Sequence, residues 1–203
     1  MKILIACEFS GVVREAFRKK GHDAWSCDIL DAEDNSPYHL KMDAVKALQE
    51  QDWDMLIAHP PCTYLTVTGN KWFKPEYATR FPDRQKNRVE AIEFFMEFAK
   101  TNISKVCIEN PIGIMSTNWK KPDQIISPHQ FGHMEAKKTC LWLKNLPLLK
   151  ATNIVEPEYT TYKSGKRMAT WYANAIKLPK DERMKVRSKT FQGIADAMAD
   201  QWG

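Results

Sequence analysis

The sequence predicts an α/β protein with a mostly parallel sheet and helices on both faces. Continuous apolar runs of strand length recur along the chain, at 2–7, 53–58 and 104–110. Segments with apolar residues at helical spacing alternate with these runs, and such alternation is typical of a parallel sheet. The 203 residues, 43% of them hydrophobic, fit one domain over 1–203. A chain of this size buries roughly 70% of its unfolded surface.

Each expected element has its own signal. The first strand, 2–7, leads into a helix at 11–20, whose apolar residues recur at helical spacing until Gly21 ends it. The longest helical pattern runs over 83–102, and an amphipathic helix closes the chain at 192–201. The same reasoning predicts strands at 23–28, 53–58, 104–110 and 138–143 and a short helix at 45–51.

Composition excludes several classes of protein. No apolar run approaches the roughly 20 residues that span a bilayer, and the first residues lack the basic leader and cleavage pattern of a signal peptide. Five cysteines without a C-x-x-C pair argue against a disulfide framework or a zinc knuckle. We therefore expect a cytoplasmic protein without a membrane partner or a metal.

The charge is mildly basic and unevenly distributed. A net charge of +5 is compatible with a polyanionic partner. The stretch 163–189 carries nine Lys or Arg residues against two acidic ones. It is either a solvated surface or a face that contacts phosphates, with Lys163, Lys166 and Arg167 as candidate contacts.

The cysteines divide into two groups. Four lie inside predicted strands, where a small apolar side chain is most simply a core residue: Cys7, Cys27, Cys107 and Cys140. Cys62 instead follows the carboxyl end of a strand, which is where open α/β sheets bind ligands. Pro60 and Pro61 stiffen the loop before it.

A catalytic cysteine at 62 needs a rigid setting and local charges or dipoles that favour the thiolate. His59 and nearby backbone amides are candidates for this effect, although we interpret His59 itself as a bulky filler rather than a local base. Glu109 and Asn110 close a second strand at the same rim. One nucleophile and one carboxyl acid are the minimum for attack on a heteroaromatic ring. A turn cysteine without a chemical role remains the alternative on this stretch alone.

Two further strand ends indicate a nucleotide-like ligand. Gly11 follows the first strand and allows the backbone to approach a small ligand at a helix start. Asp28 ends the second strand, where acids accept hydrogen bonds from ribose hydroxyls in nucleotide-binding α/β folds.

These residues, taken in order, resemble the motifs of the DNA cytosine C5-methyltransferase family. The resemblance spans nearly the whole chain, and its strongest elements are PPC after one apolar strand and EN after a later one. The matching segments are FSG at 9–11, Asp28, Asp43, PPC at 60–62, EN at 109–110, FG with a downstream basic pair at 131–138, and QGIADAMA at 192–199.

The resemblance implies a Rossmann-like methyltransferase fold and methyl transfer from S-adenosylmethionine to carbon 5 of cytosine. In this interpretation Cys62 attacks C6 of the ring, and Glu109 contacts N3 and the exocyclic amine. A base taken from a duplex must be flipped out. The resemblance assigns cofactor binding to Phe9, Ser10, Gly11, Asp28, Ile29, Asp43 and Pro60, and substrate binding to Pro61 and Asn110.

The sequence departs from the family pattern at three places. Val13 stands where the family has a glycine, so the cofactor loop must open differently or bind more weakly. Lys137 and Thr139 stand where the family has two arginines, the second of which helps to stabilise the attacked base. The resemblance therefore makes Lys137 a catalytic candidate, together with Lys138, which can substitute by a shift of one residue. A lysine is a point charge and cannot form the bidentate fork of an arginine.

The third departure is length. The segment 144–190 occupies the place of a much larger target-recognition region, so we expect short or relaxed sequence specificity. The loop 63–82 is expected to close over the site, with aromatic residues that either stack near the base or pack within the loop. The partner is expected to be DNA, duplex or single-stranded, and a monomer is compatible with the sequence.

Two other functions stay open at this stage. An amino-methyltransferase acting on adenine N6 or cytosine N4 also carries a proline pair at this strand end. It requires an aromatic residue where this chain has Cys62, and Tyr64 comes two residues late. A non-catalytic protein that binds cofactor or DNA is the other alternative, favoured by Val13 and Thr139 and opposed by Cys62 and Glu109.

Overall fold

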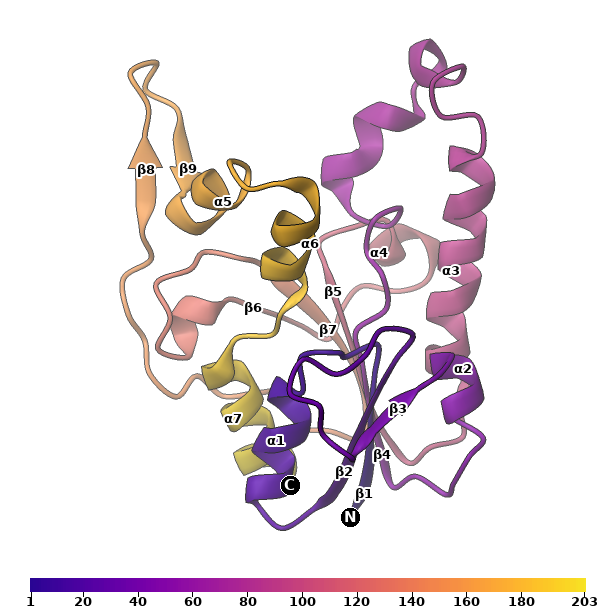
Figure 1. Cartoon of the computed structure of the whole chain (residues 1–203). Coiled ribbons are helices and arrows are strands. Elements are labelled where there is room, and N and C mark those ends of the chain that lie inside the picture. The colour runs from indigo at the N-terminus through magenta and orange to yellow at the C-terminus, as the bar shows by residue number, and fades with distance from the viewer.

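The computed structural model describes residues 1–203, and a seven-stranded sheet lies at its centre (Figure 1). The strands follow the order β3-β2-β1-β4-β5-β7-β6. In chain order they are β1 Lys2–Ala6, β2 Asp23–Asp28, β3 His39–Lys41, β4 Met55–Ala58, β5 Lys105–Pro111, β6 Gln124–Ile126 and β7 Thr139–Lys144. A separate hairpin pairs β8 Tyr159–Thr161 with β9 Arg167–Ala169.

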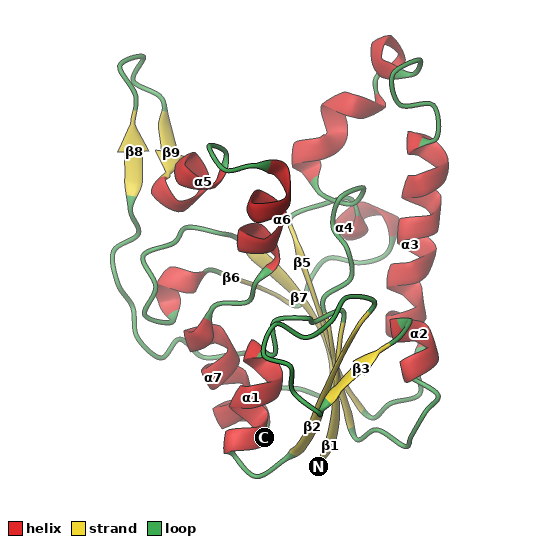
Figure 2. Ribbon diagram, in the orientation of Figure 1, coloured by secondary structure: helices red, strands yellow, loops and turns green.

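Helices connect and cover the strands (Figure 2). The α-helices are α1 Val12–Lys19, α2 Ala44–Ala47, α3 Arg84–Lys100, α4 Met115–Asn118, α5 Thr170–Ala175, α6 Lys180–Ser188 and α7 Gln192–Trp202. Three short 3-10 helices are η1 Val67–Phe73, η2 Pro75–Tyr77 and η3 Pro128–Gln130. No helix has both the length and the apolar character needed to cross a bilayer.

Strands β1 to β5 run parallel, and β7 runs antiparallel to both β5 and β6. The central strands β1 and β4 are apolar throughout, or nearly so, because neighbouring strands and helices bury both of their faces. The strand order reverses at β1, which makes the carboxyl ends of β1 and β4 a topological switch point. The predicted α/β class, with a mostly parallel sheet of Rossmann-like methyltransferase topology, is confirmed.

Two separate cores fill the two faces of the sheet. On one face, Ile3 and Ile5 of β1 pack with Phe17 of α1 and with apolar residues of α7. On the other face, Leu4 of β1 packs with Phe95 of α3. Successive strand residues point to opposite faces, so each core receives alternate residues of the same strand. Figure 1 shows α1 and α7 on one side of the sheet and α2 and α3 on the other.

Some expected elements differ from those observed. The strand expected at 2–7 ends at Ala6, and Cys7 lies beyond it, half-buried with a left-handed φ of 59°. The helix expected at 45–51 is shorter, because α2 ends at Ala47, and Trp53 precedes β4 rather than beginning it. The short strands β3, β6, β8 and β9 and the helices α5 and α6 were not predicted.

Two projections rise beyond the carboxyl ends of the parallel strands (Figure 1). One contains the hairpin β8-β9 with α5 and α6, and it includes most of the segment 144–190. The other contains η1, η2 and the first turns of α3. Figure 1 shows the carboxyl edge of the sheet at the base of these projections, between the two.

Candidate active site

The ends of β4 and β5 bring His59 and Glu109 together. Ala58 of β4 pairs with Ile108 of β5, so the next residue of each strand lies beside the other. The Nδ1 atom of His59 lies 2.9 Å from Oε2 of Glu109, and the two side chains are 8% and 15% exposed. His59 therefore makes a buried polar contact that its interpretation as a filler did not foresee.

A second contact across the same two strands supports the proline loop. Asn110 is buried, and its Nδ2 donates a hydrogen bond of 2.7 Å to the carbonyl oxygen of Pro60. Its Oδ1 is buried without a hydrogen-bond partner. Pro60 is buried and Pro61 exposed. One N–H of the Asn110 amide thus holds the loop before Cys62, and its second N–H and its oxygen have no protein partner.

Cys62 lies at the start of a tight turn. Its carbonyl oxygen accepts hydrogen bonds of 3.0 Å from the backbone amides of Leu65 and Thr66, and its side chain is half-buried. Burial, and then the charge of Glu109, raise the pKa of the thiol above its ordinary value of 9.0. The charges of Lys137 and Arg187 act in the opposite direction. At neutral pH the thiol form therefore dominates.

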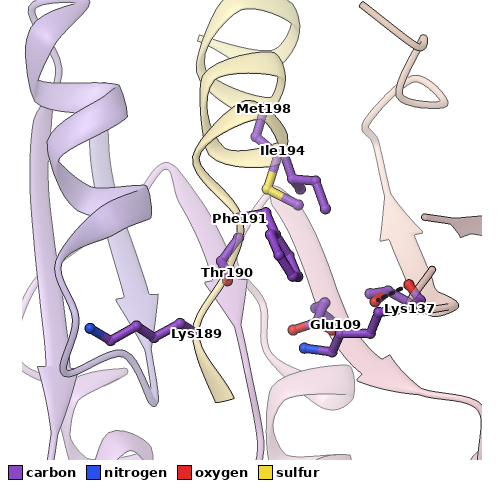
Figure 3. A pocket seen from close by; sticks show the side chains of 8 residues that line it. Glu109, Lys137, Lys189, Thr190, Phe191, Ile194 and Met198 are labelled. Carbon is purple, nitrogen blue, oxygen red and sulfur yellow. Dashed lines mark hydrogen bonds between the residues drawn. The ribbon is translucent and has the colours of Figure 1, made fainter. Parts of the chain in front are cut away.

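The pKa of Glu109 is shifted in the opposite direction, below its ordinary value. Burial raises its pKa, but the hydrogen bond with His59 and the charge of Lys137 outweigh burial and lower the pKa below its ordinary value. Figure 3 shows the side chain of Lys137 extending toward Glu109. Both belong to a small pocket beneath the start of α7, lined by Glu109, Lys137, Thr139, Lys189, Thr190, Phe191, Ile194 and Met198.

The two lysines of the basic pair lie in different surroundings. The Nζ of Lys137 donates a hydrogen bond of 3.0 Å to the carbonyl oxygen of Arg187, whereas Lys138 is exposed and makes no hydrogen bond. Thr139 is buried in β7. The structure thus brings Lys137, and not Lys138, to Glu109.

Arg187 is a site residue that sequence reasoning missed. It lies near the end of α6, its guanidinium is 5.3 Å from the ring centre of Tyr172, and its charge acts on Cys62. Its position within the cationic stretch 163–189 was the only available signal. Arg187, far along the sequence, comes near the site because the end of α6 lies beside the segment before β7, where Lys137 binds the Arg187 carbonyl.

The loop after β1 contains a second residue that was missed. The carboxylate of Glu8 is buried and accepts hydrogen bonds from the amides of Val13, at 2.7 Å, and Arg14, at 3.2 Å. It therefore occupies the amino-terminal end of α1. Val13 is fully buried in the core, so no ligand reaches it. Gly11 has a φ of 72° and lies against the Arg14 guanidinium, a position that leaves no space for a Cβ.

Asp28 is the last residue of β2, and Asp43 follows the neighbouring strand β3 by two residues. Both charges contribute to the raised pKa of Cys7, after burial, and the Asp28 carbonyl accepts a hydrogen bond from the amide of Met42. One oxygen of Asp28 accepts from the Leu30 amide, and one oxygen of Asp43 caps α2. Each carboxylate keeps a second oxygen without a protein partner.

These features fit the nucleoside part of S-adenosylmethionine. The free oxygens of the two carboxylates can accept from ribose hydroxyls and an adenine amine, and Ile29 presents an apolar side chain that is 72% exposed beside them. Phe9 and Ser10 are half-buried in the loop between β1 and α1. No group of three or more His, Cys, Asp or Glu residues is arranged to hold a metal ion.

The predicted phosphate contacts lie apart from this cluster. Lys163, Lys166 and Arg167 are exposed at the tip of the β8-β9 hairpin, which Figure 1 shows at the outer end of its projection. Arg167 stacks on Tyr159 at 4.6 Å. The structure therefore groups Cys62 and Glu109 with Lys137 but leaves these three cations on a separate surface.

Similarity to known proteins is limited to the fold. No protein-family model and no curated protein matches the chain. Among solved structures, the chain is similar to one described as a DNA modification methyltransferase encoded within a prophage of E. coli. The TM-score is 0.48 and the identity 14%, over 76% of this chain and 51% of the other, so the chain spans about half the length of that relative. Function is therefore inferred from the chain's own residues.

Proposed function

We propose that the chain is an S-adenosylmethionine-dependent methyltransferase that methylates C5 of cytosine in DNA through a covalent bond from Cys62. The observation that carries the proposal is a half-buried thiol just after β4 and a buried acid at the end of the neighbouring strand β5, close enough for the acid's charge to raise the pKa of the thiol. The acid is Glu109, held by His59 at 2.9 Å. A protein with only a packing role for these residues has no need to bury a carboxylate at this rim.

The residues that would bind the cofactor lie at or just after the carboxyl ends of β1, β2 and β3. Asp28 and Asp43 hold the ribose and adenine through their free carboxylate oxygens, and Ile29 covers the adenine. Phe9, Ser10 and Gly11 form the wall near the methionine part. The amides of Val13 and Arg14 already bind Glu8, so the methionine carboxylate takes its partners elsewhere in this loop. The bound cofactor supplies an electrophilic methyl group.

Cys62 begins the reaction by adding to C6 of cytosine. A bond forms between Sγ and C6, and negative charge moves through the ring toward C5 and N3. The carboxylate of Glu109 accepts a hydrogen bond from the exocyclic amine, takes up the proton that leaves the Cys62 thiol and passes it to N3. The proton that leaves the Cys62 thiol balances the proton gained at N3, so this addition changes no net charge.

Release of the product reverses the addition. Once C5 carries the methyl group, water takes the C5 proton, the bond between Sγ and C6 breaks, and the N3 proton returns through Glu109 to the departing Cys62 thiolate. His59 keeps Glu109 oriented throughout these steps. Lys137 and Arg187 favour the anionic states of the site, because their charges lower the pKa of Cys62. In the case of Lys137 the charge also lowers the pKa of Glu109.

Mass spectrometry of nucleosides tests this function. DNA from cells that express the chain is digested, and cells that express Cys62→Ser serve as the matched control. The proposal predicts 5-methyl-2′-deoxycytidine from the wild-type chain only. N4-methylcytosine or N6-methyladenine would identify an amino-methyltransferase instead, and equal levels of 5-methyl-2′-deoxycytidine in both samples would exclude the Cys62 mechanism.

A further inference from the structure

A group of unpaired cations lies on the projection that contains η1, η2 and the start of α3. Lys71, Arg80, Arg84 and Arg88 form no ion pair, whereas two lysines of the same projection do, in the pairs Lys74–Glu76 and Lys86–Glu90. Burial, and then the charge of Arg84, lower the pKa of Arg88. This part of the molecule is therefore short of negative charge.

Arg88 has a structural role in this group. Its guanidinium lies 3.2 Å from the ring centre of Phe73. It donates to the carbonyl oxygen of Tyr64 at 3.0 Å and to the side chain of Asn70 at 2.8 Å. These three contacts tie η1 and the turn after Cys62 to α3. The binding capacity of Arg88 is thus largely used within the chain.

Arg84 differs because its donors have no acceptors. Its guanidinium lies 4.6 Å from the ring centre of Phe73 and 5.2 Å from that of Tyr64, so the rings hold it in place. Its side chain donates no hydrogen bond, and its Nε is buried without a partner. A buried donor without an acceptor destabilises the folded chain. The Nη groups of Arg84 also donate to no protein atom, so they are available to a ligand.

Arg84 opens into a pocket with further donors. The pocket is lined by Tyr64, Arg80, Phe81, Pro82, Asp83, Arg84 and Asn87. The Tyr64 hydroxyl accepts a hydrogen bond of 3.0 Å from Asn87, which leaves its own proton free to donate. Asp83 is the one carboxylate in the lining, and it is exposed and pairs with neither arginine.

We propose that this pocket binds a phosphate group of the acceptor, contacted by Arg84, Arg80 and the Tyr64 hydroxyl. Guanidinium groups stacked on aromatic rings present their N–H edges to phosphate oxygens. The hydroxyl group supplies a further hydrogen-bond donor from another side of the phosphate. Tyr64 follows Cys62 by two residues, so the bound phosphate lies beside the proposed base site. The inference rests on the proposed function for its substrate class, and the phosphate belongs to a nucleic-acid backbone or to a free nucleotide.

The first experiment measures binding of DNA without cofactor. Fluorescence anisotropy with a labelled 16-nucleotide single strand compares wild type, Arg84→Gln and Arg80→Gln over a series of salt concentrations. Each lost phosphate contact is expected to lower the slope of log affinity against log salt by about 0.7. Lys86→Gln is the matched control, because it removes the same charge from the same helix at an exposed residue that pairs with Glu90.

The second experiment distinguishes the source of the phosphate. Calorimetry compares deoxycytidine with its 5′-monophosphate on wild type and Arg84→Gln. A reduced salt slope with the arginine variants assigns the pocket to a DNA backbone, and loss of a wild-type preference for the monophosphate assigns it to a nucleotide. Arginine variants that match Lys86→Gln in both experiments overturn the proposal. Neither experiment involves methyl transfer, so failure of the methyltransferase assignment does not affect the result.

Discussion

The contact between His59 and Glu109 supports a quantitative prediction. His59→Phe keeps an aromatic ring of similar size but removes the hydrogen bond of 2.9 Å to the carboxylate. Both side chains are largely buried, so solvent screening is weak. Hydrogen bonds to charged groups contribute about 1.5–3 kcal/mol, and the free energy of unfolding should fall by that amount at pH 7. Urea denaturation followed by tryptophan fluorescence measures it.

The pH dependence of this difference follows from Glu109. Its pKa lies below the ordinary value of 4.5, so the unfolded chain binds a proton before the folded chain does. The contribution of the carboxylate is therefore complete above pH 4.5 and disappears as the pH falls through the folded-state pKa. The difference between wild type and His59→Phe should shrink over the same range.

A matched control separates this contact from a general effect of the substitution. His129 is half-buried and its ring makes no hydrogen bond, so His129→Phe should change the free energy of unfolding by less than about 1 kcal/mol. A His59→Phe variant as stable as this control at pH 7, or one whose deficit is the same at pH 7 and pH 4, would refute the reasoning.

Three further predictions concern the thiol and its loop. Lys137→Gln should slow alkylation of Cys62 by iodoacetamide at pH 8 by about two- to fivefold, because a nearby charge that favours the thiolate is lost. The exposed Lys138→Gln should leave this rate unchanged, and equal rates in both variants would contradict the assignment. The wild-type rate should rise steadily between pH 7 and pH 9, because burial raises the Cys62 pKa above 9.0, and a plateau below pH 8 would disagree. Asn110→Leu should destabilise the chain by about 1–3 kcal/mol in urea denaturation, because the hydrogen bond to Pro60 is lost, and an unchanged midpoint would argue against that role.

The long elements of the fold could be predicted from sequence, and the short ones could not. The strand expected at 23–28 has the observed bounds, and the helices expected at 83–102 and 192–201 differ from α3 and α7 by one or two residues at their ends. These segments bury a continuous apolar pattern. Strands β3 and β6 have three residues each and lie at the edges of the sheet, where little apolar surface is needed. Periodicity also does not record direction, so it gave no sign that β7 is antiparallel.

For the candidate site, the sequence could predict only which residues lie at the carboxyl ends of the strands. Parallel strands end at one edge of a sheet, which is why Cys62 and Glu109 could be expected at the same rim. The contact of His59 with Glu109 depends on the register between β4 and β5. The local sequence of either strand does not predict that register. Arg187 comes near the site because the end of α6 contacts Lys137. Glu8 lies at the start of α1 because its carboxylate accepts hydrogen bonds from the amides of Val13 and Arg14. Both depend on tertiary contacts that residue type alone does not indicate.

The covalent bond from Cys62 to cytosine is the central claim and can be measured directly. The chain is incubated with S-adenosylmethionine and DNA that contains 5-fluorocytosine, which cannot lose the C5 substituent, and intact mass is recorded after denaturation. The account predicts a species with the mass of chain, DNA and one methyl group, absent for Cys62→Ser and reduced for Glu109→Gln. An adduct that persists in Cys62→Ser, or no adduct on DNA that the wild-type chain binds, would contradict it.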